Sequence, residues 1–204
     1  MFSSGLKVYI VMDLYTQNLD EFYKQEIQPS RDITLSILSQ IAHAISFVHS
    51  KKYIHRDLKP KNILVRTTGE DYVEAAIGDF GLCRRIEGST GFHGGCGTPP
   101  YNTAPETDCT TKFDMWALGI LMFEILYVTS DNTPSAHILD KAITQIIELA
   151  RNGKIDQLKQ AVGQRVGVKS IKNLIVRCLH KDPTQRITAE EVCSKECMKR
   201  LPLF

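Results

Sequence analysis

The chain has 204 residues, enough for one domain with a buried core. Apolar residues make up 43% of the sequence and charged residues 24%, proportions typical of a soluble globular protein. The formal net charge of +2 is too small to indicate binding to nucleic acid or to a membrane surface.

The first predicted element is a strand at Lys7–Leu14, where β-branched and apolar residues dominate. Because apolar residues occupy both alternating sides, we expect this strand to be buried on both faces. Asp13 interrupts the apolar stretch, which therefore does not have the form of a secretory signal. The longest later apolar run, Met115–Phe123, is too short to cross a bilayer. We expect no membrane segment in this chain, although a longer parent protein could carry an anchor.

A long helix is predicted after Ser30, a residue that suits the N-cap position. The apolar residues that follow recur at helical spacing: Ile33, Ile37, Ile41, Ile45 and Val48. Lys51 and Lys52 suit a helix C-terminus, because cations interact favourably with that end of the helix dipole. Two short strands, Ile63–Val65 and Val73–Ile77, are then predicted to form a hairpin across a polar turn.

The rest of the chain is predicted to be a long loop followed by helices. Glu87–Pro100 is rich in Gly, Ser, Thr and Pro, and loops of this length in compact domains usually serve a function. Thr188 and Glu191 form the pattern of a capping box. Four helices are predicted: Phe113–Tyr127, Pro134–Arg151, Val168–His180 and Thr188–Arg200. The predicted fold class is mainly α (α+β), one domain over residues 1–204 with one entering strand and a small β-hairpin.

The six cysteines lack the even spacing of a disulfide framework, which favours reduced thiols and a cytoplasmic location. Cys193 and Cys197 are four residues apart and could share a helix face, so a metal site is one interpretation of them. No second pair of ligands follows at a spacing typical of zinc sites, which favours ordinary thiols.

Three motifs carry the functional information. The octapeptide His55–Asn62 (HRDLKPKN) matches the pattern His-Arg-Asp-Leu-x-x-x-Asn at every fixed position. Asp79-Phe80-Gly81 and then Ala104-Pro105-Glu106 follow it in order. A match to one triplet alone could arise by chance. The octapeptide together with the two later triplets, in this order, is a specific signature. The sequence thus resembles the catalytic domain of eukaryotic Ser/Thr protein kinases, whose long helix and hairpin stand at the same places.

This resemblance implies transfer of the γ-phosphate of ATP to Ser or Thr of a protein substrate, with Mg²⁺ as the metal. Asp57 would accept the proton of the substrate hydroxyl. Lys59 would neutralise the transferring phosphate, and a Lys at this position resembles Ser/Thr rather than Tyr kinases. Asn62 and Asp79 would hold magnesium, because carboxylate and amide oxygens are the hard ligands that Mg²⁺ prefers.

Near the N-terminus, the stretch Met12-Asp13-Leu14-Tyr15 resembles the gatekeeper and hinge that contact adenine in this family. Leu64 would form the floor beneath the adenine. A plain buried strand is the alternative interpretation of Met12.

The activation segment of the family has matches as well. Arg56 would bind a phosphate on this segment, for which Ser89 and Thr90 are the candidate sites. An ordinary flexible loop is the alternative interpretation of that Ser-Thr pair. Thr98 resembles the threonine that faces the substrate in Ser/Thr kinases.

Three further residues resemble structural positions of the family. Asp114 would hold the backbone of the catalytic loop, and Glu106 with Arg186 would form a buried ion pair. Two departures lie beside them. Asn102 and Thr103 stand where one residue is usual, and the short spacing from Glu106 to Asp114 predicts that a short helix is missing. Both departures fall in the region that docks the substrate.

The N-terminal β-lobe of the family has no counterpart in this sequence. Neither Gly-x-Gly-x-x-Gly nor Val-Ala-x-Lys precedes the catalytic loop. The resemblance therefore covers a hinge and a C-terminal lobe, and we expect this chain alone to be weak or inactive. A pseudokinase-like scaffold or regulatory interaction module is the alternative function.

Short stretches resemble two different subfamilies. Residues 18–23 and 79–85 look like the unfolded-protein-response kinase/endoribonucleases, whereas residues 119–127 look like the stress kinases that phosphorylate a translation initiation factor. The sequence does not identify the protein substrate, the upstream activator or the oligomeric state.

Overall fold

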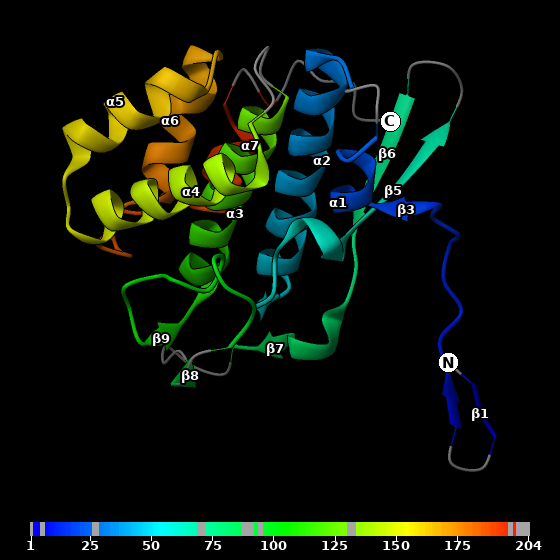
Figure 1. Ribbon diagram of the computed structural model, residues 1–204. Helices are drawn as coiled ribbons and strands as arrows, with labels where there is room; N and C mark the ends of the chain where they lie inside the picture. Colours follow the sequence, from blue (N-terminus) through cyan, green and yellow to red (C-terminus); the bar gives the residue numbers. More distant parts are fainter. Residues whose placement is uncertain are drawn as a thin grey trace.

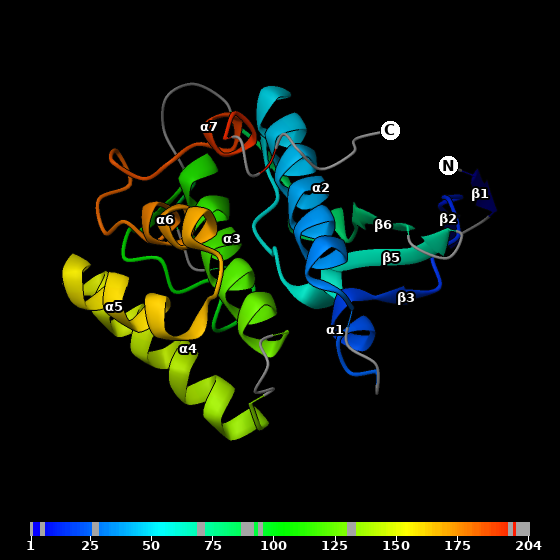
Figure 2. The same ribbon diagram turned by 90° about the horizontal axis from the view of Figure 1, so that it is seen from above.

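The computed structural model describes residues 2–4, 7–25, 29–68, 72–86, 92–93, 96–129, 134–195 and 198. Two long helices form its centre, α2 (Arg31–Ser50) and α3 (Thr111–Val128). They lie side by side, with a β-hairpin against the far side of α2 and further helices against α3 (Figures 1 and 2). The predicted mainly α class is confirmed.

Helix α2 begins where the sequence predicts, because Ser30 Oγ accepts a hydrogen bond from the Ile33 N–H at 3.3 Å. Its apolar side chains are buried on one face: Ile37, Leu38, Ile41, Ala42 and Ile45. Among the described residues, α2 alone is long and apolar enough to suit a membrane span. Its buried face packs against α3 and the hairpin, so core packing accounts for that composition.

Helix α3 is buried around nearly its whole circumference, which explains why its sequence is apolar on every side. The apolar side chains from Met115 to Phe123 are at most 3% exposed. Gly119 allows α6 (Lys169–Cys178) to approach closely, because a Cβ at this position would lie 2.7 Å from Cβ of Cys178. Helix α4 (Ala136–Arg151) packs against another side of α3.

The C-terminal helices follow the sequence prediction, with one additional helix. Helix α7 (Ala189–Cys193) covers the first part of the predicted range Thr188–Arg200, and Thr188 and Glu191 form the predicted capping box. Residues 196–197 and 199–200 of that range lie outside the described residues. The sequence does not predict α5 (Ile155–Arg165), which buries only three side chains: Leu158, Ala161 and Val162. A short helix, α1 (Leu19–Phe22), also forms, with a capping box of its own between Asn18 and Glu21.

The predicted hairpin is present as β5 (Ile63–Thr68) and β6 (Tyr72–Ile77), with Ile63 opposite Ile77. Strand β3 (Gln17–Asn18) pairs with β5, which gives an antiparallel sheet in the order β3-β5-β6. The 3₁₀ turn η1 (Pro60–Asn62) leads into β5, and a second, η2 (Phe80–Leu82), follows β6. The hairpin register therefore places the end of the first motif beside the start of the second.

Two small strand pairs complete the lower part of the molecule in Figure 1. Strand β4 (Tyr53–Ile54) pairs with β7 (Arg84–Arg85), and β8 (Phe92–His93) pairs with β9 (Asp108–Cys109). Strand β9 lies between Glu106 and Asp114, where the sequence predicts that the short helix of the family is absent. Part of the predicted loop Glu87–Pro100 lies outside the described residues.

The predicted buried strand at Lys7–Leu14 is wrong. Only β2 (Lys7–Tyr9) is a strand, and it pairs with β1 (Phe2–Ser4) in a hairpin that lies away from the helices (Figure 1). Val11, Met12 and Leu14 are 76%, 63% and 83% exposed. Apolar composition indicates a strand but not its partner, and no described strand pairs with residues 10–14.

Candidate active site

The loop that carries the first motif is held in place by Asp114, from the first turn of α3. Its fully buried carboxylate accepts hydrogen bonds from two backbone N–H groups, that of His55 at 2.9 Å and that of Arg56 at 2.8 Å. His49 Nε2 lies 2.8 Å from the same carboxylate. Arg56 has a φ of +73°, a conformation that costs free energy outside glycine and therefore needs such support.

Three side chains gather around Asp57, which is 8% exposed. Lys59 Nζ donates to Asp57 Oδ2 at 2.6 Å, and Thr98 Oγ1 donates to Asp57 Oδ1 at 2.8 Å. Lys59 Nζ also lies 2.7 Å from Thr98 Oγ1. Asn62 Nδ2 donates to Asp57 Oδ2 at 2.9 Å and to the Asp57 carbonyl at 2.8 Å. The structure thus brings Asp57, Lys59 and Asn62 together, and Thr98 joins them from far along the chain.

The electrostatics of this cluster favour a charged Asp57. Burial alone would raise the pKa of the Asp57 carboxyl, but the hydrogen bonds from Lys59, Thr98 and Asn62 outweigh it and hold the pKa below its ordinary value. The carboxylate is therefore ionised at neutral pH. It can accept a hydrogen bond from an incoming hydroxyl.

Asp79 joins the group through the backbone of the hairpin. The Gly78 N–H donates to the Asn62 carbonyl at 2.7 Å, and His55 Nε2 lies 3.0 Å from the Gly78 carbonyl. Asp79 itself is exposed, has a φ of +55° and caps η2, where its Oδ1 accepts from the Gly81 N–H at 3.2 Å. Asn62 and Asp79 therefore lie at the same end of the β5–β6 hairpin.

The donor chemistry at this end of the hairpin suits Mg²⁺. Because Asn62 directs its Nδ2 toward Asp57, its Oδ1 has no hydrogen bond among the described residues. An amide oxygen and a carboxylate are hard ligands, and Mg²⁺ usually takes only one or two protein ligands, with water and phosphate oxygens as the others. In the described part of the chain, no group of three or more His, Cys, Asp or Glu side chains forms a metal site.

The structure does not bring the predicted hinge residues to this cluster. Met12, Asp13 and Leu14 are exposed along the segment that leads from β2 toward β3. Tyr15 instead contacts the sheet, where its hydroxyl donates to Glu74 Oε1 at 3.0 Å. Leu64 is half-buried on β5, so close to Gly78 that a Cβ there would lie 3.1 Å from the leucine side chain. Contact of these residues with adenine stays a prediction.

The segment after the predicted loop is anchored by an ion pair. Arg186 is buried and its Nη2 donates to Glu106 Oε2 at 2.8 Å, while Nη1 also contacts this carboxylate. The guanidinium further donates to the carbonyls of Lys112 and His180, at 2.7 Å and 3.0 Å, and lies over the Trp116 ring. The predicted pairing of Glu106 with Arg186 is present.

The predicted phosphate contact of Arg56 involves Ser89 and Thr90, which lie outside the described residues, as does Cys197. In the structure Arg56 Nε donates to Cys96 Sγ at 2.9 Å. This contact was not predictable from spacing, because the two residues are 40 positions apart.

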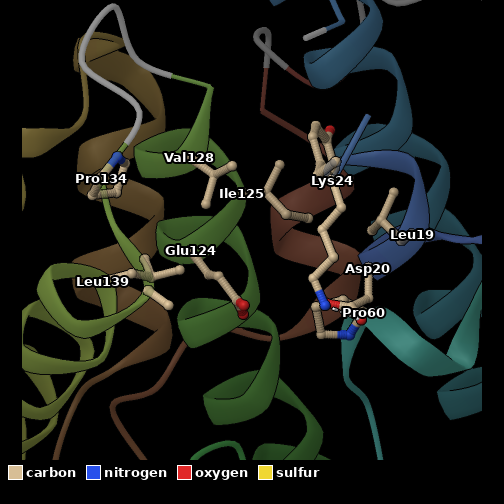
Figure 3. Close-up of a pocket in the computed structure, with 11 residues that line it drawn as sticks. Leu19, Asp20, Lys24, Pro60, Glu124, Ile125, Val128, Pro134 and Leu139 are labelled. Atoms are coloured by element: carbon tan, nitrogen blue, oxygen red, sulfur yellow. Dashed lines mark hydrogen bonds and ion pairs between the residues drawn. The ribbon is translucent and has the colours of Figure 1, made fainter. Parts of the chain in front are cut away.

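A pocket of about 320 Å³ adjoins the catalytic loop at Pro60, between α1, α3 and the start of α4 (Figure 3). Glu124 points into it from α3, opposite the ion pair of Lys24 with Asp20. The Tyr101 hydroxyl donates to Glu124, and burial raises the pKa of the Glu124 carboxyl to about 7. Sequence reasoning missed this group, because a glutamate in an apolar helix gives no sign of its partner.

Comparison with known proteins agrees with this geometry. The family model described as protein kinase domain matches residues 1–198. Serine/threonine-protein kinase 33 of Mus musculus is 30% identical over 209 residues, which cover 96% of this chain and 41% of that protein. The phosphorylase b kinase gamma catalytic chain, liver/testis isoform, of Bos taurus is 26% identical over 209 residues, which cover 98% of this chain and 48% of that protein.

The chain thus spans less than half the length of these relatives. The crystal structure of the yeast RNA Pol II CTD kinase CTDK-1 complex matches with a TM-score of 0.76, covering 99% of this chain and 74% of that one. At 22% identity this match shows likeness of fold. The resemblance to either of the two subfamilies is weak and stays a prediction. With the family model matching residues 1–198, the chain belongs to the protein kinase family.

Proposed function

We propose that this chain carries the phosphoryl-transfer site of a Ser/Thr protein kinase that uses ATP and Mg²⁺. The observation that carries the proposal is the cluster of Asp57, Lys59, Asn62 and Thr98, with distances of 2.6 to 2.9 Å between their side chains. A carboxylate, an ammonium, an amide and a hydroxyl in one place supply the positioning and charge neutralisation that phosphoryl transfer requires.

Asp57 would orient the substrate hydroxyl and accept its proton as the oxygen attacks the phosphorus. Its low pKa keeps the carboxylate ready to accept this hydrogen bond. Lys59, which already contacts both Asp57 and Thr98, would offset negative charge on the phosphoryl group. Asn62 Oδ1 and the Asp79 carboxylate would hold Mg²⁺. The bound metal supplies neutralisation of the phosphate charge.

Thr98 is in a position to sense the acceptor residue. Its hydroxyl bridges Asp57 Oδ1 and Lys59 Nζ, which are the groups that an acceptor Ser or Thr would meet. An acceptor hydroxyl would compete for these hydrogen bonds. We therefore assign Thr98 a positioning role beside the acceptor.

The test is phosphate transfer by the longest natural form of the protein. With Mg-ATP and casein as a general acceptor, Asp57→Asn should lower incorporation by on the order of 10²-fold or more, the usual contribution of a positioned proton acceptor. Asp156→Asn, an exposed acid on α5, is the matched control and should change nothing. Equal incorporation by Asp57→Asn and the unsubstituted protein would refute the assignment.

A second candidate function is a scaffold or regulatory module that does not transfer phosphate. The exposure of Met12 and Leu14 favours it, because an adenine bound there would be open to water on this side. Calorimetric titration of the 204-residue chain with Mg-ATP distinguishes the two. Binding at micromolar concentration would count against the scaffold, and the absence of heat would favour it for this chain.

A further inference from the structure

Two thiols meet beside the candidate active site. Cys96 Sγ and Cys109 Sγ are 3.8 Å apart, although 13 residues separate them in the chain. Cys109 is at the end of β9 and is 2% exposed, whereas Cys96 is half-buried just before Gly97. A disulfide requires about 2.0 Å between the sulfurs, so the two sulfurs would have to approach each other by about 1.8 Å.

The two thiols have different surroundings. The Arg56 guanidinium donates to Cys96 Sγ at 2.9 Å, and the Cys96 side chain is half-buried. Burial, with the charge of the neighbouring Cys96, raises the pKa of the Cys109 thiol to about 11. Cys96 is the more accessible of the two thiols and is therefore assigned as the nucleophile. Cys109, behind it, suits the role of the resolving thiol.

We propose that Cys96 and Cys109 form a peroxide-sensitive thiol pair that closes to an intramolecular disulfide. In the first step, the Cys96 thiolate attacks one oxygen of a hydroperoxide and the O–O bond breaks. The leaving alkoxide or hydroxide takes up a proton, and the sulfur, two electrons poorer, becomes a sulfenic acid.

In the second step, Cys109 loses its proton and its sulfur attacks the sulfenic sulfur. The S–O bond breaks, and the departing hydroxide takes up the proton to form water. Two thiols and one hydroperoxide thus give one disulfide, one alcohol or water molecule, and one further water molecule.

Closure of this pair would disturb the cluster at Asp57. Gly97, next to Cys96, has a φ of +88°, and a Cβ there would lie 2.5 Å from the Arg56 carbonyl, so the backbone is tightly packed. Thr98 follows at once and bridges Asp57 and Lys59. A movement of Cys96 toward Cys109 also removes the sulfur that Arg56 contacts. The expectation that oxidation lowers activity rests on the proposed function. The expectation that the disulfide forms does not depend on it.

The experiment is treatment of the 204-residue chain with hydrogen peroxide, followed by non-reducing peptide mapping by mass spectrometry. We expect a Cys96–Cys109 peptide lighter by two hydrogens, loss of two titratable thiols, and recovery of both with dithiothreitol. In Cys109→Ala, dimedone should trap a sulfenic acid on Cys96. Cys193→Ser, a half-buried cysteine on α7, is the matched control and should leave the disulfide unchanged.

Cys96 should react with iodoacetamide faster than Cys109, because it is the more exposed of the two thiols. Equal reactivity of the two thiols, or a linkage only between separate chains, would overturn the proposal. Cys96 reacting no faster than Cys193 would do the same. In the longest natural form of the protein, a disulfide that forms without a change in phosphate transfer would support the thiol pair and refute its effect on activity. If no transfer is measurable even when reduced, the proposed function fails and the disulfide stands.

Discussion

Asp114 Oδ1 accepts a hydrogen bond of 2.8 Å from the backbone N–H of Arg56, across 58 positions of the chain. The contact joins the first turn of α3 to the loop that carries Asp57. The loop is therefore fixed to the most deeply buried helix among the described residues. The positions of the catalytic candidates thus depend on a residue that does not touch them.

Asp114→Asn should destabilise the protein although it keeps the size of the side chain. The amide has one accepting oxygen, so a donor among the His55 and Arg56 N–H groups and the His49 ring loses its partner, at a cost of about 1–3 kcal/mol. Urea unfolding measures the change. The exposed control Asp156→Asn should stay within about 0.5 kcal/mol, and an equal loss in both would contradict this account.

Glu106→Gln should lower the free energy of unfolding by about 3–5 kcal/mol, because it leaves the buried Arg186 guanidinium without its counter-charge. The double variant Glu106→Gln with Arg186→Met should lose less than the sum of the single variants. Lys159→Gln removes an exposed ion pair of 3.4 Å and should cost at most about 1 kcal/mol. Additive losses in the double variant would show that the two side chains act independently.

Gly97→Ala should destabilise the protein by about 1–3 kcal/mol, because the residue has a φ of +88° and its new Cβ would meet the Arg56 carbonyl. Gly167→Ala is the matched control, since a Cβ there meets nothing within 4 Å. It should be neutral or slightly stabilising. Thermal unfolding of the two variants gives the comparison, and equal melting temperatures would argue against a packed backbone at Gly97.

Glu124 should make stability depend on pH. Its pKa rises from 4.5 to about 7 in the folded state, mainly through burial, so the folded protein holds a proton that the unfolded chain releases. The contribution of the protonated Glu124 carboxyl to the free energy of unfolding is complete below pH 4.5 and is lost as the pH rises toward about 7. Its upper limit is about 3 kcal/mol, reduced by the partial exposure of the side chain.

In Glu124→Gln this part of the pH dependence should vanish, since the amide does not titrate. Urea unfolding at a series of pH values from 4.5 to 7 tests it. Glu190→Gln, an exposed glutamate of α7, should keep the dependence of the unsubstituted protein. A Glu124→Gln profile parallel to the unsubstituted one would rule out the carboxyl as its source.

Features that depend on neighbours in sequence were predictable. The Ser30 cap and the capping box of Thr188 and Glu191 each involve residues three positions apart, and both are present. The β5–β6 hairpin follows from two apolar runs around a polar turn. Helix α5 was not predictable in this way, because it buries few side chains and contains Gly163.

In the candidate site, too, contacts between residues close in sequence were predictable, whereas contacts between distant residues were not. Asp57, Lys59 and Asn62 lie within six residues of one another, so their motif already implies their proximity. Thr98 approaches them from a position 41 residues beyond Asp57. The partners of Cys96 and Glu124, like the exposure of residues 10–14, depend on which elements pack together, and local sequence patterns do not show that packing.

The apolar circumference of α3 has a consequence for how the protein assembles. A helix without a polar side is not stable in water by itself, so α3 acquires its structure only as its neighbours cover it. Folding should therefore be a single concerted event for the helical part and not a stepwise addition of helices. Deleting α6 would uncover the strip around Gly119 and produce an aggregating chain, not a smaller folded core.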